Sequence, residues 1–314
     1  MQTLFRHGDL VRAQVEAQKA SAYYSNRSPS WGWRFRLLEA WVLAWRGKYA
    51  EIPKVLDAEL PSSTTESDLR LETQVLTSIA EIRLHRYPEA VQTLTAARQA
   101  CNSQQSLVCA EVSIAAGSLE VERGAYEHAR PLFFNSLVLA RGQRDRFLEA
   151  WSLLNLSHVA LLEEHFDEAT DLSDHTYKLA SIIGAQRIML TAEGNLGWAS
   201  YKTGDSERAL GLFLDAQQRA KVSGSMVDEV RWLTDTGYIY VDQGKYSLAE
   251  DCYRKALELA RQIDTKEQIS DAITSLAFVT LRTGELDAAK QYSEEAIALA
   301  RADNNRIRRR NLSG

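Results

Sequence analysis

A short turn motif recurs eight times along this chain of 314 residues, at a nearly constant spacing. Each copy begins with an anchor residue, usually glycine, and has alanine or isoleucine five residues later. The anchors are Gly8, Gly47, His85, Gly124, Glu164, Gly204, Gly244 and Gly284, with steps of 39, 38, 39, 40, 40, 40 and 40 residues. A fixed period of this size is typical of stacked helical units that contact their neighbours. We therefore predict one continuous repeat array, with a role in binding rather than catalysis.

The composition narrows the class of protein further. Only five prolines interrupt long stretches rich in alanine, leucine, glutamate and arginine, which favours helix. The net charge of −5 offers no general attraction to nucleic acid or to an anionic membrane. No apolar run reaches the length of about 18 residues that a transmembrane helix needs.

The three cysteines, Cys101, Cys109 and Cys252, are an odd and scattered set. We therefore expect neither a disulfide framework nor a zinc cluster, and this favours a reducing compartment. The predicted location is the cytoplasm, and no cofactor is expected.

The unit at residues 190–222 shows how one copy folds. Apolar residues recur at helical spacing before Gly204 and again from Ala209 to Ala220. Gly204 suits the left-handed end of a helix, and Asp205 suits the N-cap of the next one. Two antiparallel helices joined by so short a turn form a helical hairpin.

Small residues recur at the two positions where the helices of a hairpin would meet. At the position seven residues before the anchor, the small residues are Ala40, Ser78, Gly117, Ser157, Gly197, Gly237 and Ala277. At the position five residues after the anchor, they are Ala90, Ala129, Ala169, Ala209, Ala249 and Ala289. Because small side chains let two backbones approach, bulky residues are expected to fill the grooves beside them.

This pattern resembles the tetratricopeptide repeat (TPR). The match is closest in Asn195-Leu196-Gly197…Gly204-Asp205…Ala209…Phe213…Ala216 and in Gly237…Tyr240…Gly244-Lys245-Tyr246…Ala249…Tyr253…Ala256-Leu257. The resemblance covers roughly residues 4–302 and implies an all-α, right-handed α-solenoid of about seven to eight helix-turn-helix repeats. The 40-residue period resembles a longer-helix subclass, which includes arrays in bacterial regulators and arrays attached to caspase-like CHAT protease domains.

The array is expected to span 1–302, with irregular repeats in 1–145, regular repeats in 146–302 and a basic, disordered tail at 303–314. The irregular features are of three kinds. His85 and Glu164 replace glycine at two turns, which are expected to need a different helix cap. Pro53 and Pro131 are expected to kink their helices. Residues 61–68 are interpreted as a loop between repeats.

Two features at the ends suggest a piece of a larger protein. The first motif begins at Gly8, which leaves about half a helix before it. No polar cap helix follows the hairpin at Gly284, although repeat arrays usually end in one. An effector domain of the same full-length chain is therefore one candidate partner.

The residues six positions before each anchor form a set that we call the ladder. Its members are Trp41, Ile79, Ser118, His158, Trp198, Tyr238 and Phe278. Resemblance to TPR arrays implies that this face of the first helix lines a concave groove, where aromatic rings suit an extended or helical peptide. Nearby polar groups that could bond such a peptide are Asn155, Asn195, Asp235, Tyr201, Lys202 and Arg231. The alternative is that the rings pack between first helices and the asparagines bond locally.

Four of the seven tryptophans, Trp31, Trp33, Trp41 and Trp45, lie within fifteen residues. The simpler interpretation is the core of an irregular end repeat, because tryptophan is highly buried on average. The alternative is a docking surface for another domain or for a second copy of the chain.

Catalysis finds little support in the motifs. No Gly-x-Ser-x-Gly elbow and no glycine-rich phosphate loop occur. His165, Glu168, Asp171 and His175 lie near or on one helix, but acids on an outward face are usually solvated, and no metal is assigned. The predicted function is a non-catalytic protein-binding or peptide-binding scaffold or sensor, not an enzyme. A self-assembly module is the alternative, a metal-dependent enzyme is a remote one, and neither membrane nor nucleic-acid binding is expected.

Overall fold

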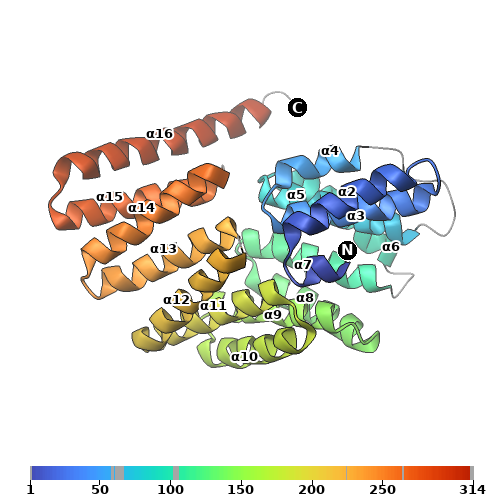
Figure 1. The fold of residues 1–314 in the computed structure, drawn as a ribbon, viewed down its shortest axis with the longest axis horizontal. Helices are drawn as coiled ribbons and strands as arrows, with labels where there is room; N and C mark the ends of the chain where they lie inside the picture. The colour runs from blue at the N-terminus through green and yellow to red at the C-terminus, as the bar shows by residue number, and fades with distance from the viewer. Residues whose placement is uncertain are drawn as a thin grey trace. The chain divides into compact units, whose positions relative to one another are not determined.

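The computed structural model describes residues 2–57, 60, 67–101, 106–223, 225–263 and 265–311, without the side chains of residues 2, 223 and 302–311. These residues form sixteen α-helices and one short 3-10 helix, with no strand in the ranges described (Figure 1). The helices are α1 (Gln2–Arg6), α2 (Leu10–Tyr24), α3 (Pro29–Trp45), α4 (Ile52–Leu56), α5 (Ser67–Arg83), α6 (Tyr87–Cys101), α7 (Leu107–Glu122), α8 (Tyr126–Gly142), α9 (Arg146–Leu162), α10 (Phe166–Ile183), α11 (Gln186–Lys202), α12 (Ser206–Ser223), α13 (Met226–Asp242), α14 (Tyr246–Ile263), α15 (Lys266–Thr283) and α16 (Leu286–Asn311).

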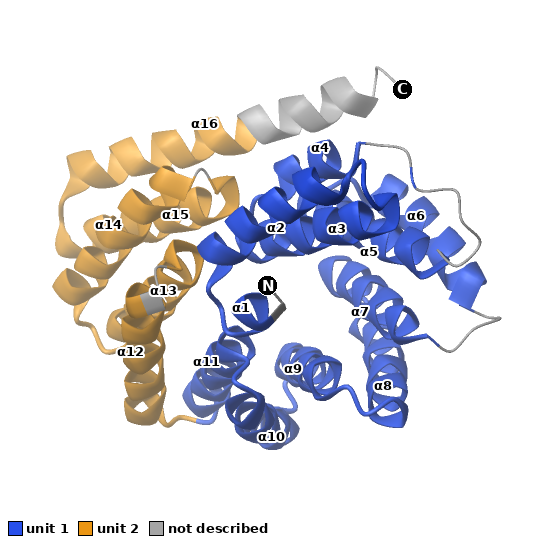
Figure 2. Cartoon of the chain, turned by 45° about the vertical axis from the view of Figure 1, so that its right-hand side comes forward, with its two compact units in different colours: residues 1–203 blue, residues 204–314 orange. Residues whose placement is uncertain are grey.

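The chain divides into two compact units (Figure 2). Unit 1 spans Met1–Thr203 and unit 2 spans Gly204–Gly314. Around each anchor, an odd-numbered helix precedes the turn and an even-numbered helix follows it, and we call these the first and second helices. Within unit 1 the neighbouring first helices α3, α5, α7, α9 and α11 pack in sequence, and within unit 2 α13 packs on α15. The predicted helical solenoid is thus present. The division of the array into irregular repeats at 1–145 and regular repeats at 146–302 stays a prediction.

All eight turn anchors adopt the left-handed backbone conformation. Six are glycines, such as Gly204 with a φ of 92°. His85 and Glu164 adopt the same conformation, with φ of 56° and 61°. The expectation that these two turns need a different cap is therefore wrong. Both turns keep the left-handed geometry because the packing of the two helices requires it. The backbone of the non-glycine residue at each turn is strained as a result.

The second helices begin where the motif predicts. Seven of them start two residues after the anchor, at Leu10, Tyr87, Tyr126, Phe166, Ser206, Tyr246 and Leu286. Asp205 acts as the expected cap, because its side-chain oxygen accepts a hydrogen bond of 3.0 Å from the Arg208 amide. The proline expectations have two outcomes: Pro131 lies inside a continuous α8, whereas Pro53 lies in the five-residue α4, which follows a 3-10 turn at Tyr49–Glu51.

Two of the glycines seven residues before an anchor, Gly117 and Gly237, lie against an aromatic ring of the second helix of their own hairpin. A Cβ atom added at Gly117 would lie 2.6 Å from the Phe133 ring, and one at Gly237 would lie 2.5 Å from the Tyr253 ring. Both rings are 1% exposed. Where the small residue is Ala or Ser instead, the sequence has Leu or Ser at the facing position: Leu56, Leu94, Ser173 and Ser293. Glycine is therefore paired with an aromatic ring, and the larger Ala or Ser is paired with a smaller side chain.

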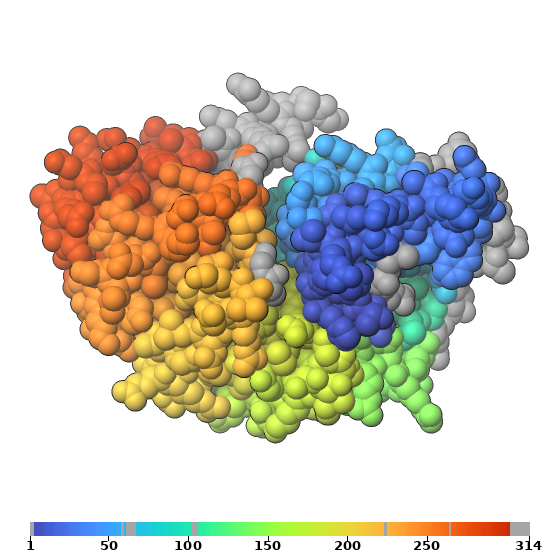
Figure 3. Space-filling view, viewed as in Figure 1, coloured from blue at the N-terminus to red at the C-terminus, as the bar shows by residue number. Residues whose placement is uncertain are grey.

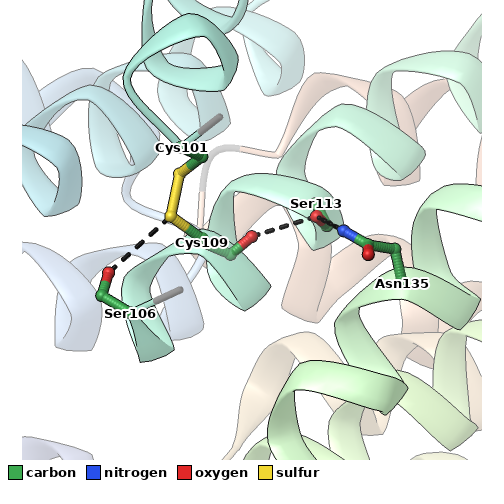
Figure 4. Close-up of a disulfide and its surroundings, with 5 residues drawn as sticks. All are labelled: Cys101, Ser106, Cys109, Ser113 and Asn135. Atoms are coloured by element: carbon green, nitrogen blue, oxygen red, sulfur yellow. Dashed lines mark hydrogen bonds between the residues drawn. A yellow bond between two sulfur atoms is a disulfide. The ribbon is translucent and has the colours of Figure 1, made fainter. Parts of the chain in front are cut away.

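The structure corrects the interpretation of the cysteines. Cys101 ends α6 and Cys109 lies in the first turn of α7, and the two form a disulfide with a Cα–Cα distance of 5.7 Å (Figure 4). The packing of α6 against α7 brings together residues that the sequence shows only as flanking a polar linker. Cys252 is a free thiol, and burial raises its pKa to about 11. The argument from unpaired cysteines for a reducing compartment therefore no longer holds.

Two expectations fall partly on residues outside the description. Of the predicted loop at 61–68, residues 61–66 are not described. The last helix extends to Asn311, past residue 302 where the array was expected to end. The side chains of the basic tail predicted at 303–314 lie outside the described residues.

Candidate peptide-binding surfaces

Unit 2 presents two ladder aromatics on adjacent first helices. Tyr238 lies on α13 and Phe278 lies on α15, at the same position relative to their turns. Their side chains are 47% and 48% exposed, whereas tryptophan and phenylalanine residues of the core are almost fully buried. Leu281, one helical turn after Phe278, is 57% exposed and extends the same apolar surface. We call Tyr238, Phe278 and Leu281 the aromatic face of unit 2.

The polar residues expected beside this face separate into two kinds. Arg231 is exposed on α13, where its guanidinium lies 5.7 Å from the centre of the Trp232 ring. Asp235 is buried at 8% exposure, and its charge contributes to the raised pKa of Tyr253, whose main cause is burial. Arg231 is thus available to a partner, while Asp235 belongs to the packing beneath the face.

Unit 1 carries the two other ladder residues singled out as groove residues. His158 on α9 is exposed, and Trp198 on the neighbouring α11 is partly buried. The Trp198 ring makes an edge contact of 5.6 Å with the ring of Tyr201, which is also partly buried, and Lys202 beside it is exposed. These residues form a surface of mixed character on α9 and α11.

The two asparagines expected beside the ladder bond within unit 1. The Asn155 amide donates to the carbonyl oxygen of Trp151 at 2.7 Å. The Asn195 amide donates to the hydroxyl of Ser157 at 2.8 Å, which ties α11 to α9. Asn155 thus bonds within its own helix, and Asn195 bonds to the neighbouring first helix.

The first helices of unit 1 follow an arc, with α1 on its inner side (Figure 2). Aromatic residues of α1, α3 and α9 lie against one another. Trp41 on α3 meets Trp151 on α9 edge to face, with ring centres 5.5 Å apart, although α5 and α7 lie between these helices in the array. Trp45 stacks on Phe147 at 5.8 Å, and Phe5 lies 4.7 Å from Trp45. We call Phe5, Trp41, Trp45, Phe147 and Trp151 the aromatic cluster.

Most of the tryptophan-rich segment is packed in or beside this cluster. Trp33 and Trp41 are 4% and 7% exposed, and Trp45 is packed within the cluster. Trp31 alone among the four is at the surface, at 56% exposure. The core interpretation therefore describes three of these residues, and Trp31 is what remains of a docking surface.

Two carboxyl groups also face this inner side of unit 1. The indole of Trp41 donates to Glu72 on α5 at 2.9 Å, and burial raises the pKa of Glu72. Burial raises the pKa of Glu111 on α7 well above its usual value, and the charges of Glu72 and Asp145 raise it further. Sequence reasoning missed both residues, although each lies thirteen positions before its anchor, the position that Trp151 occupies on α9.

Two members of the histidine and acid set at α10, His165 and Glu168, interact with other side chains of unit 1. Arg130 forms ion pairs with Glu168 at 2.6 Å and with Glu163, and these carboxylates raise its pKa. His165 lies 3.7 Å from Glu168. Among the described residues, no group of three or more His, Cys, Asp or Glu side chains is placed to hold a metal ion.

No helix in the described part of the chain is both long and apolar enough to cross a membrane. No curated protein matches the chain in sequence. The model of the family described as tetratricopeptide repeat matches residues 229–302, which correspond to most of unit 2.

Three solved structures illustrate the similarity in fold. A Rap protein complexed with Competence and Sporulation Factor is 15% identical, with a TM-score of 0.68 over 85% of this chain and 76% of that one. NprR in complex with its cognate peptide NprX is 18% identical, with a TM-score of 0.59 over 81% and 73%. A signal transduction ATPase with a tetratricopeptide repeat sensor, PH0952 from Pyrococcus horikoshii, is 15% identical, with a TM-score of 0.58 over 93% and 47%.

At these identities the similarity concerns the fold, and the association with CHAT domains stays a prediction. The repeated hairpins, the left-handed anchors and the matched family model agree with one another. Residues 229–302 belong to the tetratricopeptide repeat family, and the chain is a helical-repeat protein of the TPR type.

Proposed function

We propose that this chain is a non-catalytic module that binds a peptide segment on the aromatic face of unit 2. The observation that supports this most is the pair of half-exposed rings, Tyr238 and Phe278, at the same position on two adjacent first helices. Rigid aromatic side chains give large contact area for little loss of conformational entropy, and they dominate the energetics of many interfaces.

The chemistry around the rings suggests the kind of peptide. Leu281 adds an aliphatic contact, and the exposed Arg231 adds a positive charge on α13. Apolar anchors with an acidic neighbour would complement this face. The complexes of the Rap protein and of NprR with their named ligands support a peptide-binding role for a chain of this fold.

The proposal is tested with peptides selected from a random display library against the purified chain. Affinity is then measured by fluorescence anisotropy for the wild type, for Y238A/F278A, and for the control L214A/L248A. Leu214 and Leu248 are 41% and 46% exposed but lie on the second helices α12 and α14. We expect Y238A/F278A to weaken binding by at least about 30-fold, since two central aromatic anchors contribute about 2 kcal/mol or more. Unchanged affinity in folded Y238A/F278A would refute the proposal.

Three wider predictions stay open to test. Membership of a larger regulatory or CHAT-type protein is a prediction from the sequence, as is a cytoplasmic location, which the Cys101–Cys109 bond does not support. Trp198 and His158 lie in unit 1 and form a separate surface for mutation. The self-assembly alternative loses most of its surface, because Trp33, Trp41 and Trp45 pack inside unit 1.

A further inference from the structure

The first residues of the chain pack into unit 1 as a short separate segment. The helix α1 has five residues, and a helix of one turn has little stability of its own in water. Its position on the inner side of the arc, visible in Figure 2, is therefore maintained by contacts of individual side chains. The ring of Phe5 is 8% exposed, with its centre 4.7 Å from Trp45 and 6.3 Å from Phe147.

The neighbouring Arg6 forms an ion pair with Asp145, whose carboxylate is already oriented by the start of α9. Its guanidinium lies 3.7 Å from Oδ2 of Asp145 and 5.0 Å from the centre of the Phe147 ring. The other oxygen of Asp145, Oδ1, accepts hydrogen bonds of 2.9 Å from the amides of Phe147 and Leu148. Because the cap fixes one oxygen at the start of α9, the second oxygen is held toward the segment that brings the arginine.

Further charged groups surround this site, among them Arg187, whose guanidinium lies 5.2 Å from the centre of the Trp45 ring. Oε2 of Glu111 is buried with no hydrogen-bond partner in the described part of the chain. Glu72 and Asp145 act on Glu111 with charges of the same sign. Arg34 offsets part of the charge of Glu72. Aromatic rings beside the Asp145 carboxylate form a surface complementary to a segment that combines an aromatic with a basic side chain.

We propose that Trp45, Phe147 and Asp145 form an anchoring site for peptide segments in which an aromatic residue is followed by arginine, and that Phe5 and Arg6 occupy it as an internal ligand. The internal segment has the advantage of a high effective concentration, so a partner peptide must compete with it. This site lies wholly in unit 1 and does not depend on the aromatic face of unit 2.

The test supplies the segment from outside. The probe is a synthetic peptide of residues 3–9, Thr-Leu-Phe-Arg-His-Gly-Asp, added to the full chain carrying F5A/R6A. Binding is followed by tryptophan fluorescence, because Trp45 and Trp151 lie in the cluster. We expect saturable binding to F5A/R6A that is at least about tenfold tighter than binding to the wild type.

Two changes in the peptide and one in the chain distinguish a specific site from general stickiness. The F5A and R6E forms of the peptide are each expected to bind at least about tenfold more weakly. Adding D145N to F5A/R6A keeps an N-cap side chain but removes the charge, and should weaken binding of the original peptide by a similar factor. Adding V11A instead is the matched control, since Val11 is 62% exposed on α2, whose atoms lie at the surface in Figure 3.

Two results would overturn the proposal. One is the absence of saturable binding at millimolar peptide in an F5A/R6A chain whose circular dichroism matches that of the wild type. The other is equal affinity for the original, F5A and R6E peptides. If F5A/R6A does not fold, the single variant R6A is used with the same criteria, because the Arg6 side chain is 46% exposed and contributes little to the core.

Discussion

The aromatic ring of Tyr253 requires glycine at the facing position 237. A Cβ at Gly237 would lie 2.5 Å from Cε1 and 2.7 Å from Cζ of Tyr253. Ordinary contacts between carbon atoms are about 3.5–4.0 Å, so the ring would have to move by about 1 Å. The ring is 1% exposed and touches Tyr238, with ring centres 6.3 Å apart, so little space is open to it.

The magnitude follows from two opposing effects of G237A. Overpacking a filled site costs about 1–3 kcal/mol, whereas replacing glycine by alanine inside a helix stabilises by about 1 kcal/mol. The matched control is G211A, because a Cβ at Gly211 in α12 of the same unit meets nothing within 4 Å. The helix effect is common to both variants, so G237A should be less stable than G211A by about 1–3 kcal/mol.

The assay is urea unfolding at 25 °C, followed by circular dichroism, with hydrogen exchange of α13 and α14 as a local readout. Repeat proteins can lose two-state behaviour, and the exchange measurement places any change on the hairpin that carries it. In a Y253L background the smaller side chain should leave space for the added Cβ, so G237A should then be neutral or stabilising. If G237A stabilised the wild-type chain as much as G211A does, the pairing of glycine with the facing ring would be refuted.

E164G should raise the free energy of unfolding by about 1 kcal/mol, because Glu164 has a φ of 61° that glycine adopts without strain. Thermal unfolding measures this change, and an equal gain from a glycine placed at an ordinary helical position would contradict the explanation. E111Q should stabilise the chain increasingly as the pH rises above about 4.5. A carboxyl whose folded pKa is raised above its unfolded pKa contributes stability below the unfolded pKa, and this stability is lost as the pH rises through the folded pKa. A difference in melting temperature between E111Q and the wild type that does not change with pH would contradict this. C101S/C109S should lower the free energy of unfolding by about 2 kcal/mol, as expected for a bond that closes a short loop. Dithiothreitol should lower the stability of the wild type but not of that variant, and thiol alkylation of the chain taken directly from cells would show whether the bond forms there.

The sequence predicted the repeated hairpin well because each hairpin is defined by short-range patterns. The anchors, the cap at Asp205 and the start of α14 at Tyr246 all follow from the local preferences of a few residues. The left-handed conformation of His85 and Glu164 was not predicted, because propensity disfavours it and tertiary packing decides it.

The contacts between distant repeats were beyond prediction from the repeat alone. Trp41 and Trp151 meet only because small rotations from one hairpin to the next add up around the arc of unit 1. The same accumulation brings Phe5 and Asp145 to one site, and no single repeat carries a signal for it. The ladder identified Tyr238 and Phe278 as candidates, but their exposure depends on how the hairpins of unit 2 stack, which the sequence does not specify.

Cysteine pairing failed for a related reason. Cys101 and Cys109 were treated as unrelated positions, although the packing of α6 against α7 brings two residues eight apart into bonding distance. A reading that placed both residues at helix ends facing one turn would have found the pair. The geometry of consecutive antiparallel helices is therefore part of the evidence on cysteine pairing in repeat proteins.

The central claim is that the aromatic face of unit 2 binds a peptide, and hydrogen exchange of the chain with and without a saturating selected peptide tests it most directly. The account predicts slower exchange in α13 around Tyr238 and in α15 around Phe278, with little change in α14, and loss of this protection in Y238A/F278A. Protection confined to the second helices, or protection that persists in folded Y238A/F278A, would contradict it.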